Sequence, residues 1–225
     1  MQVYKDITVV FDLDDTLYFE ADYVCSGIKY VTSWLQDYLN KNRDNSVASS
    51  ALNTPNPISY LIKHYELDDI WLESLLWLYR LHLPNICLTD EVSRTIDLLV
   101  AKGANVCILT DGRLSTQNLK IKALGLESFK SYISESFGED KPGRKRFIQV
   151  EKDFHSERYI YLGDNPKKDF IAGNDLNWLT VGIEGSTKNI HQFNLNELNS
   201  AQLPKFWISK MSDLISLINK ELNLK

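Results

Sequence analysis

Three carboxylates near the N-terminus have the types and spacing needed for chemistry. Asp12, Asp14 and Asp15 follow residues 7–11, a mostly apolar run without polar alternation, which predicts a strand buried on both faces. Because side chains alternate along a strand, we expect Asp12 and Asp14 to point the same way as the chain leaves it. Two carboxylates that close repel each other unless one is protonated or a cation lies between them. Mg²⁺ prefers oxygen ligands and would resolve the conflict.

Residues of matching chemistry recur after later strand-like runs. Thr110, Lys141 and Asp164 each come shortly after one such run. The polar residues at these places are Thr110, Asp111 and Gly112, then Lys141, then Gly163 and Asp164, with Asp169 five residues on. Because open α/β sheets place ligand sites at the carboxyl ends of their strands, we expect these residues to form one site with Asp12.

The elements that must position these residues can be read from periodicity. Apolar runs predict strands at 7–11, 104–109, 131–134, 158–162, 178–183 and 206–209. Three- and four-residue spacing predicts helices at 21–40, 58–65, 67–83, 91–102, 115–124, 142–152, 165–176 and 211–222. Residues 41–57 are polar, rich in Ser and Asn, and end in two prolines, so we expect a long loop there.

The order of these elements predicts an α/β fold. Strands alternate with helices from residue 89 onward, which favours a doubly wound, mainly parallel sheet with helices on both faces. The helical stretch after the first strand predicts an inserted all-α cap domain. We expect a catalytic core formed by residues 1–18 and 89–225 and a cap formed by residues 19–88. Closure of such a cap would exclude water and select the substrate.

Composition excludes several classes of protein. The net charge of −5, with no long basic run, argues against a nucleic-acid partner. No stretch approaches the length of a membrane span, and the N-terminus is too short and too acidic for a signal peptide. Cys25, Cys87 and Cys107 are widely spaced and odd in number, and Cys107 lies in an apolar run that predicts a buried thiol. We expect a reduced, cytoplasmic protein that is a monomer or a homodimer.

Four motifs in this order resemble the haloacid dehalogenase superfamily. Within it, the chain is similar to the Mg²⁺-dependent phosphatases that carry a helical cap after the first motif. The matching segments are FDLDDTLY at 11–18, Thr110 of LTDG, Lys141 of DKPG, and GDNPKKD at 163–169. The resemblance covers nearly the whole chain, and the motifs are specific when taken together.

The resemblance implies a role for each acidic residue. Asp12 would be the nucleophile that forms an aspartyl-phosphate. Asp14 would protonate the leaving oxygen and then take a proton from the hydrolytic water. Mg²⁺ would be held by Asp12, Asp164 and the backbone carbonyl of Asp14, with Asp169 anchoring the metal directly or through water. Asp15 is expected to make a structural hydrogen bond.

The resemblance also implies a set of phosphate-binding residues. The Thr110 hydroxyl and the backbone N–H of Asp111 would hold phosphate oxygens, with Gly112 completing this turn. Lys141 would balance the charge of the phosphoryl group during transfer. Lys168 is interpreted as a surface residue.

The reaction expected from these residues is hydrolysis of a small phosphate monoester, such as a phosphoglycolate-, sugar- or nucleotide-phosphate-like compound. Dehalogenases lack the second aspartate, so Asp14 favours phosphoryl transfer. A phosphomutase would retain every motif residue, and a regulatory module without turnover is the alternative from another class. A phosphonatase would need a lysine in the cap; Lys29 and Lys41 are present there, but nothing distinguishes them. The substrate depends on the cap and is not named by the motifs.

Overall fold

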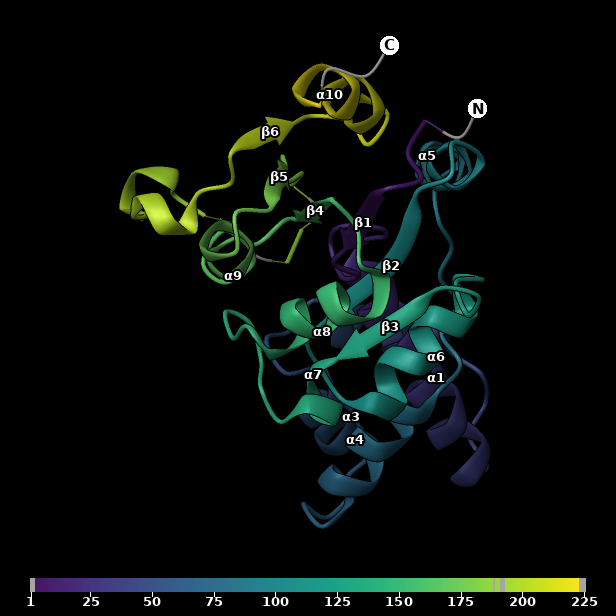
Figure 1. Ribbon diagram of the computed structural model, residues 1–225. Coiled ribbons are helices and arrows are strands. Elements are labelled where there is room, and N and C mark those ends of the chain that lie inside the picture. The colour runs from purple at the N-terminus through teal and green to yellow at the C-terminus, as the bar shows by residue number, and fades with distance from the viewer. Residues whose placement is uncertain (1–2, 188, 191–192, 223–225) are drawn as a thin grey trace.

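A single sheet of six parallel strands organises the protein (Figure 1). The computed structural model describes residues 3–187, 189–190 and 193–222. In the described residues the strand order is β3-β2-β1-β4-β5-β6. The strands are β1 (Ile7–Phe11), β2 (Asn105–Thr110), β3 (Lys130–Ile133), β4 (Arg158–Gly163), β5 (Leu179–Ile183) and β6 (Phe206–Ile208). The predicted α/β class and parallel sheet are confirmed.

The register of the central strands determines where the motifs meet. Phe11, the last residue of β1, lies opposite Ile108 of β2 on one side and Leu162 of β4 on the other. The three strands therefore end at nearly the same level of the sheet. Asp12, Thr110 and Asp164 leave that edge together, as parallel pairing requires.

Helices cover both faces of the sheet. Alternate residues of β1 enter different cores: Val9 and Phe11 pack on one face, and Val10 packs on the other. The first face is covered by α5 (Asp90–Ala101), α6 (Leu114–Ala123) and α10 (Asp213–Glu221). The second is covered by α8 (Lys145–Phe154) and α9 (Ile171–Asp175). Burial on both faces explains the continuous apolar character of the strands.

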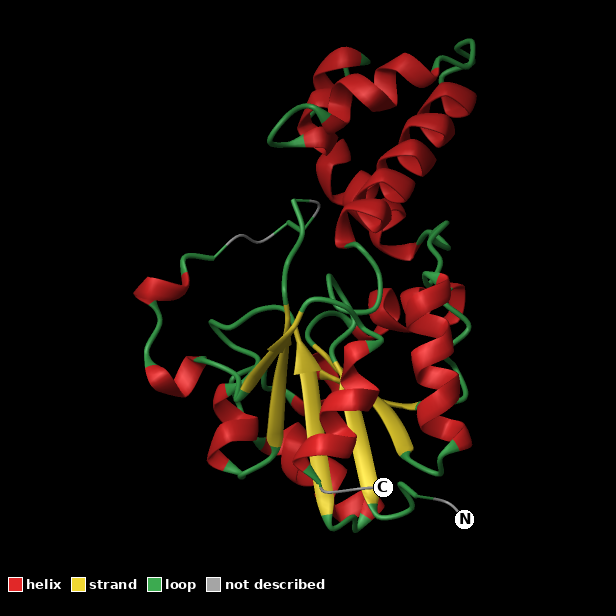
Figure 2. Cartoon of the chain, turned by 90° about the horizontal axis from the view of Figure 1, so that it is seen from above, coloured by secondary structure: helices red, strands yellow, loops and turns green. Residues whose placement is uncertain are grey.

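A block of helices stands at one end of the sheet (Figure 2). It contains α1 (Glu20–Tyr38), α2 (Asn45–Leu52), α3 (Pro57–His64) and α4 (Trp71–Leu81). These helices enclose an apolar cluster of their own, separate from the two cores of the sheet. The block also touches α6, where the Thr116 hydroxyl donates a hydrogen bond to the Arg80 carbonyl at 3.3 Å. We propose that residues 19–88 form the cap and that residues 1–18 and 89–225 form the core.

The expectation of a loop over 41–57 is wrong, because α2 occupies its centre. The Asp44 side chain accepts a hydrogen bond from the Ser46 N–H at 2.8 Å and so caps the helix. Val47, Ala48 and Ala51 are buried in the core of the helical block. Ser and Asn are weak helix formers, so this short helix is stabilised mainly by packing on its neighbours.

A charge placed on the buried face of α2 should destabilise the protein. We expect Ala51→Asp to lower the free energy of unfolding by about 3 kcal/mol or more, because an unpaired carboxylate would enter an apolar core. Ser50→Asp, at the exposed neighbouring position, should change it by less than about 0.5 kcal/mol. Urea denaturation of both variants measures the difference. Equal stability of the two would contradict burial of this helix.

Two expected helices begin later than their sequences suggest. Residues 140–144 form a turn, and α8 begins only at Lys145, whose N–H donates to the Glu139 side chain at 2.8 Å. Gly143 leaves the space that the Glu139 side chain fills. Asn165 starts a single turn instead of a long helix, and α9 runs only from Ile171 to Asp175. These two turns contain Lys141 and Asp169, which are both buried.

The remaining short elements were not foreseen: they are α7 (Ser134–Phe137) and the 3₁₀ turns η1 (Leu195–Glu197) and η2 (Ser200–Gln202). Cys107 is buried as expected, and the cysteines of the described residues carry free thiols. None of the described helices is long and apolar enough to cross a membrane.

Candidate active site

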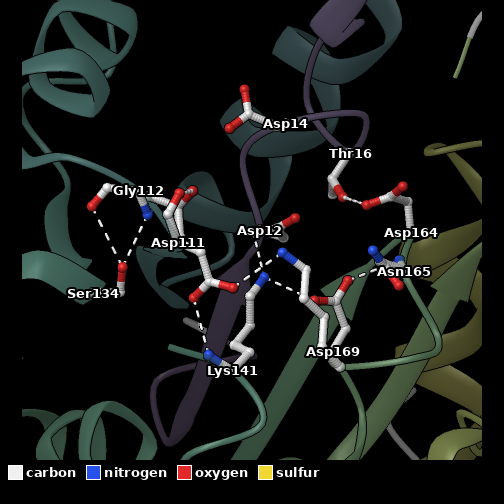
Figure 3. Close-up of polar contacts among 12 residues, drawn as sticks. Asp12, Asp14, Thr16, Asp111, Gly112, Ser134, Lys141, Asp164, Asn165 and Asp169 are labelled. Carbon is white, nitrogen blue, oxygen red and sulfur yellow. Dashed lines mark hydrogen bonds and ion pairs between the residues drawn. The ribbon is translucent and has the colours of Figure 1, made fainter. Parts of the chain in front are cut away.

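A buried lysine joins two carboxylates at the end of the sheet (Figure 3). The Lys141 ammonium lies 2.7 Å from Asp12 Oδ1 and 2.7 Å from Asp169 Oδ1, and it donates to the Tyr161 hydroxyl at 3.1 Å. The Lys141 side chain is 0% exposed. Burial alone would lower the pKa of Lys141, but Asp12 and Asp169 outweigh it and hold the pKa well above its ordinary value. Lys141 therefore carries a permanent positive charge beside Asp12.

Asp12, Asp164 and Asp169 form a cluster that could hold a metal ion. One carboxylate oxygen from each lies within 4.8 Å of the others, and all three residues are buried. In the described residues the Asp164 side chain receives a single long hydrogen bond, from Thr16 Oγ1 at 3.5 Å. Burial, and then repulsion from the neighbouring carboxylates, raises the pKa of Asp164. Burial likewise raises the pKa of Asp12, although Lys141 opposes it. Hard oxygen donors with uncompensated charge fit a divalent cation such as Mg²⁺.

Asp169 is held in place by the backbone of its own turn. The Asn165 N–H donates to Asp169 Oδ2 at 2.8 Å, while Asp169 Oδ1 faces Lys141. Gly163 permits this approach, because a Cβ there would lie 2.4 Å from Asp169 Oδ2. The glycine at the end of β4 is thus a steric requirement of the cluster.

Asp14 lies apart from this cluster, and its carboxylate contacts α6. Lys120 Nζ is 2.7 Å from Asp14 Oδ1, Gln117 Nε2 donates to Asp14 Oδ2 at 2.8 Å, and the Tyr18 hydroxyl also donates to Oδ1. Burial would raise the pKa of Asp14, but Lys120 and the three hydrogen bonds outweigh it and lower that pKa. Asp12 and Asp14 line the same cavity but have different partners, because Lys141 pairs with Asp12 and Lys120 pairs with Asp14.

Thr110 and Gly112 are both held by neighbouring side chains. Thr110 Oγ1 accepts a hydrogen bond from Gln117 Nε2 at 2.7 Å. The Gly112 N–H donates to Ser134 Oγ at 2.9 Å, and its φ of +137° is a conformation that favours glycine. The Gly112 amide is therefore engaged by the protein itself, and this residue shapes the turn around Asp111.

The Asp111 carboxylate is surrounded by cations. Its oxygens accept hydrogen bonds from two cationic side chains, at Arg146 Nη2 (2.6 Å) and Lys168 Nζ (3.0 Å). They also accept one from the backbone N–H of Lys141 at 3.0 Å. Burial would raise the pKa of Asp111, but Lys141, Lys168 and these hydrogen bonds outweigh it and lower the pKa to about 2. Its negative charge is thus compensated within the protein before any anion arrives.

Several contributing residues were missed by the sequence motifs. Arg146 is fully buried on α8 and also donates to the Thr110 carbonyl at 2.7 Å. Lys168, expected at the surface, is only 36% exposed and faces Asp111. Gln117 and Lys120 lie three positions apart on α6, so they share one helix face. This spacing is the feature of the sequence that could have indicated that both side chains reach the same site. Asp15, by contrast, makes the expected structural hydrogen bonds, accepting from the N–H groups of Glu20 and Ile190.

A cavity of about 140 Å³ opens among these residues. Among the described residues, its lining consists of six carboxylates, two neutral polar residues and one lysine: Asp12, Asp14, Asp15, Glu20, Asp111, Asp164, Thr110, Asn165 and Lys168. Asp12 therefore borders a space large enough for a phosphoryl group and a small attached group. The arrangement combines the Asp12 carboxylate, a cluster that could hold a cation and a second carboxylate, which suits group transfer to Asp12.

Residues 9–183 match the family model described as haloacid dehalogenase-like hydrolase, which covers most of the chain. The chain belongs to this family, and its enzyme class is hydrolase. The match begins in β1 and ends at the last residue of β5, so it includes every motif at the carboxyl edge of the sheet.

Similar proteins extend over the full length of the chain. Glyceraldehyde 3-phosphate phosphatase of Methanocaldococcus jannaschii is 27% identical over 241 residues, covering 96% of this chain and 97% of that protein. YfnB from Bacillus subtilis, solved bound to magnesium, aligns with a TM-score of 0.65 and 20% identity, and the alignment covers 96% of this chain and 99% of YfnB. A HAD family hydrolase from Deinococcus radiodurans, solved with bound phosphate and sodium, aligns with a TM-score of 0.66 and 15% identity, and the alignment covers 100% of this chain and 99% of that hydrolase. These structures share the fold.

Proposed function

We propose that the protein is a Mg²⁺-dependent phosphatase that hydrolyses a small phosphate monoester through an aspartyl-phosphate on Asp12. The observation that carries the proposal is the position of Asp12, which borders the cavity between Lys141 and the Asp164–Asp169 carboxylates. The phosphatase from Methanocaldococcus jannaschii supports the reaction class, and the phosphate in the Deinococcus radiodurans relative supports the ligand.

The proposed metal site uses oxygen donors from two loops. Asp12, Asp164 and the backbone carbonyl of Asp14 would hold Mg²⁺, with Asp169 supporting the site directly or through water. When bound, Mg²⁺ would offset the negative charge that otherwise keeps an anionic ester away from Asp12. The magnesium reported for YfnB supports the choice of ion.

The reaction needs two displacements at phosphorus. A carboxylate oxygen of Asp12 attacks phosphorus while the ester P–O bond breaks, and the leaving oxygen takes a proton from Asp14. Water then attacks the aspartyl-phosphate, Asp14 takes the water proton, and phosphate leaves with Asp12 restored. Lys120, Gln117 and Tyr18 favour the ionised Asp14, which is the form that the second displacement requires. The proton that Asp14 gives to the leaving oxygen is the one that it took from water in the preceding turnover, and in the free enzyme it comes from solvent.

The phosphate would lie among the residues that follow β2. We propose that the Thr110 hydroxyl and the Asp111 N–H bind its oxygens, in the turn that Gly112 shapes. Lys141 would neutralise charge on the transferring group, since phosphoryl transfer depends mainly on positioning and electrostatics. Arg146 positions this segment through the Thr110 carbonyl and the Asp111 carboxylate.

Phosphate release from a panel of phosphorylated metabolites tests the proposal. We expect release with Mg²⁺ and loss of at least about 95% of it with excess EDTA, restored when Mg²⁺ is added back. The panel contains sugar phosphates, glyceraldehyde 3-phosphate, phosphoglycolate and nucleoside monophosphates. Release that is unaffected by EDTA would contradict the metal assignment. Isomerisation of a sugar phosphate without phosphate release would replace hydrolysis by a mutase reaction.

A further inference from the structure

Glu20, the first residue of α1, is the one carboxylate of the cavity whose side chain has no partner among the described residues. Its N–H donates to Asp15 Oδ1 at 2.9 Å, but its side chain has no hydrogen bond or ion pair with any described residue. Each of the other five lining carboxylates accepts a hydrogen bond. Glu20 is therefore available to a ligand.

Glu20 lies on the side of the cavity where the leaving group would be. Glu20 and Asp14 line the same cavity, and burial and then the Asp14 charge raise the pKa of Glu20. Asp14 is the proposed acid for the leaving oxygen, so the group attached to that oxygen would extend toward Glu20. Asp12, which would hold phosphorus, lies deeper against Lys141.

The part of the cavity lining that the structure describes offers no free cation to a second anionic group. Lys168 is the one cation in its described lining, and it is bonded to Asp111 at 3.0 Å. Lys141 and Lys120, behind the lining, are paired with Asp12 and Asp14 at 2.7 Å. A carboxylate or second phosphate on the leaving group would meet Glu20 without a compensating charge, and like charges at short range repel strongly.

We propose that Glu20 is a specificity-determining residue that accepts a hydrogen bond from a hydroxyl of the leaving group and rejects leaving groups that carry negative charge. The substrate class is then the phosphate monoester of a small, uncharged, hydroxylated compound. This inference rests on the proposed phosphatase function. The cavity of about 140 Å³ suits a small substrate.

Two matched substrates test the role of Glu20. Glyceraldehyde 3-phosphate has an aldehyde where 3-phosphoglycerate has a carboxylate. The ratio of their kcat/KM values therefore measures the effect of a negative charge on the leaving group. At pH 8 the Glu20 carboxylate is mostly ionised, because burial and then Asp14 raise its pKa only to about 7. We expect the wild type to favour the aldehyde by about 100-fold and Glu20→Gln to narrow that ratio by about tenfold. Asp22→Asn removes an exposed carboxylate from the same helical turn and should leave the ratio unchanged.

The outcomes separate this inference from the proposed function. Phosphate release with an unchanged ratio in Glu20→Gln, or a wild-type preference for 3-phosphoglycerate, overturns the role of Glu20 and leaves the phosphatase standing. A preference for ethanolamine phosphate over both glyceraldehyde 3-phosphate and glycerol 3-phosphate overturns the uncharged class, because an ammonium would then pair with Glu20. If the wild type releases phosphate from no compound, the proposed function fails and the inference fails with it. Circular dichroism confirms that each variant is folded.

Discussion

Asp12→Asn is expected to lower kcat for phosphate release by about 10⁴-fold or more. The substitution preserves shape but removes the carboxylate that attacks phosphorus, and loss of a nucleophile has effects of this order in other enzymes. Initial rates with Mg²⁺ measure the loss. Asp6→Asn is the control, because Asp6 is exposed and directly precedes the opposite end of β1. Turnover by Asp12→Asn within about tenfold of the wild type would exclude an aspartyl-phosphate on this residue.

The same variant should retain its fold. Burial raises the pKa of Asp12, which means that its ionised form destabilises the folded state when no metal is bound. When the pKa of a group is higher in the folded state than in the unfolded state, the free energy of unfolding falls as pH rises above the unfolded-state pKa. A neutral Asn at position 12 removes that loss. Lys141 keeps its ion pair with Asp169 in this variant, so no buried charge is left without a partner. We therefore expect Tm of Asp12→Asn in EDTA at pH 7 to equal or exceed that of the wild type. A lower Tm would show that activity was lost through unfolding.

Lys141→Met is expected to reduce both stability and turnover. Without the ammonium, Asp12 and Asp169 would face each other in a buried space with no compensating charge. Removing one partner of a buried ion pair costs about 3–5 kcal/mol of unfolding free energy, and urea denaturation in EDTA measures it. Mg²⁺ should restore part of the loss, because it would neutralise the same carboxylates.

An exposed lysine close by provides the control for this second variant. Lys145 is mostly exposed, and its ion pair with Glu139 spans 3.9 Å, so Lys145→Met should alter the free energy of unfolding by less than about 0.5 kcal/mol. Equal denaturation midpoints for Lys141→Met and Lys145→Met would show that Lys141 does not hold the cluster together. Unchanged kcat in Lys141→Met would remove it from phosphoryl transfer.

The local sequence pattern was sufficient to predict features that depend on residues within one strand or helix. The buried runs in β1, β2 and β4 are apolar throughout, because both faces of the sheet are covered. Alternation of strands with helices then requires parallel pairing, which brings the segments after those strands to one edge. Asp12, Thr110 and Asp164 could be grouped for this reason.

The local sequence pattern did not predict features that depend on contacts between residues far apart in the chain. The α2 segment has weak helix formers, and its helix depends on burial of Val47, Ala48 and Ala51 against other cap helices. Gln117, 103 residues from Asp14, turns that carboxylate toward α6. A residue's own segment contains no information about a partner so far along the chain.

The sequence by itself determined the α/β architecture and the identity and order of the motif residues, because strand burial and motif spacing are local properties. The tertiary structure alone decided the directions and pairings of the charges. Lys141 meets Asp12 and Asp169, Lys120 meets Asp14, and Glu20 lines the cavity without a side-chain partner among the described residues. These outcomes depend on which side chains enter the same small volume, and only packing of the complete chain brings them there.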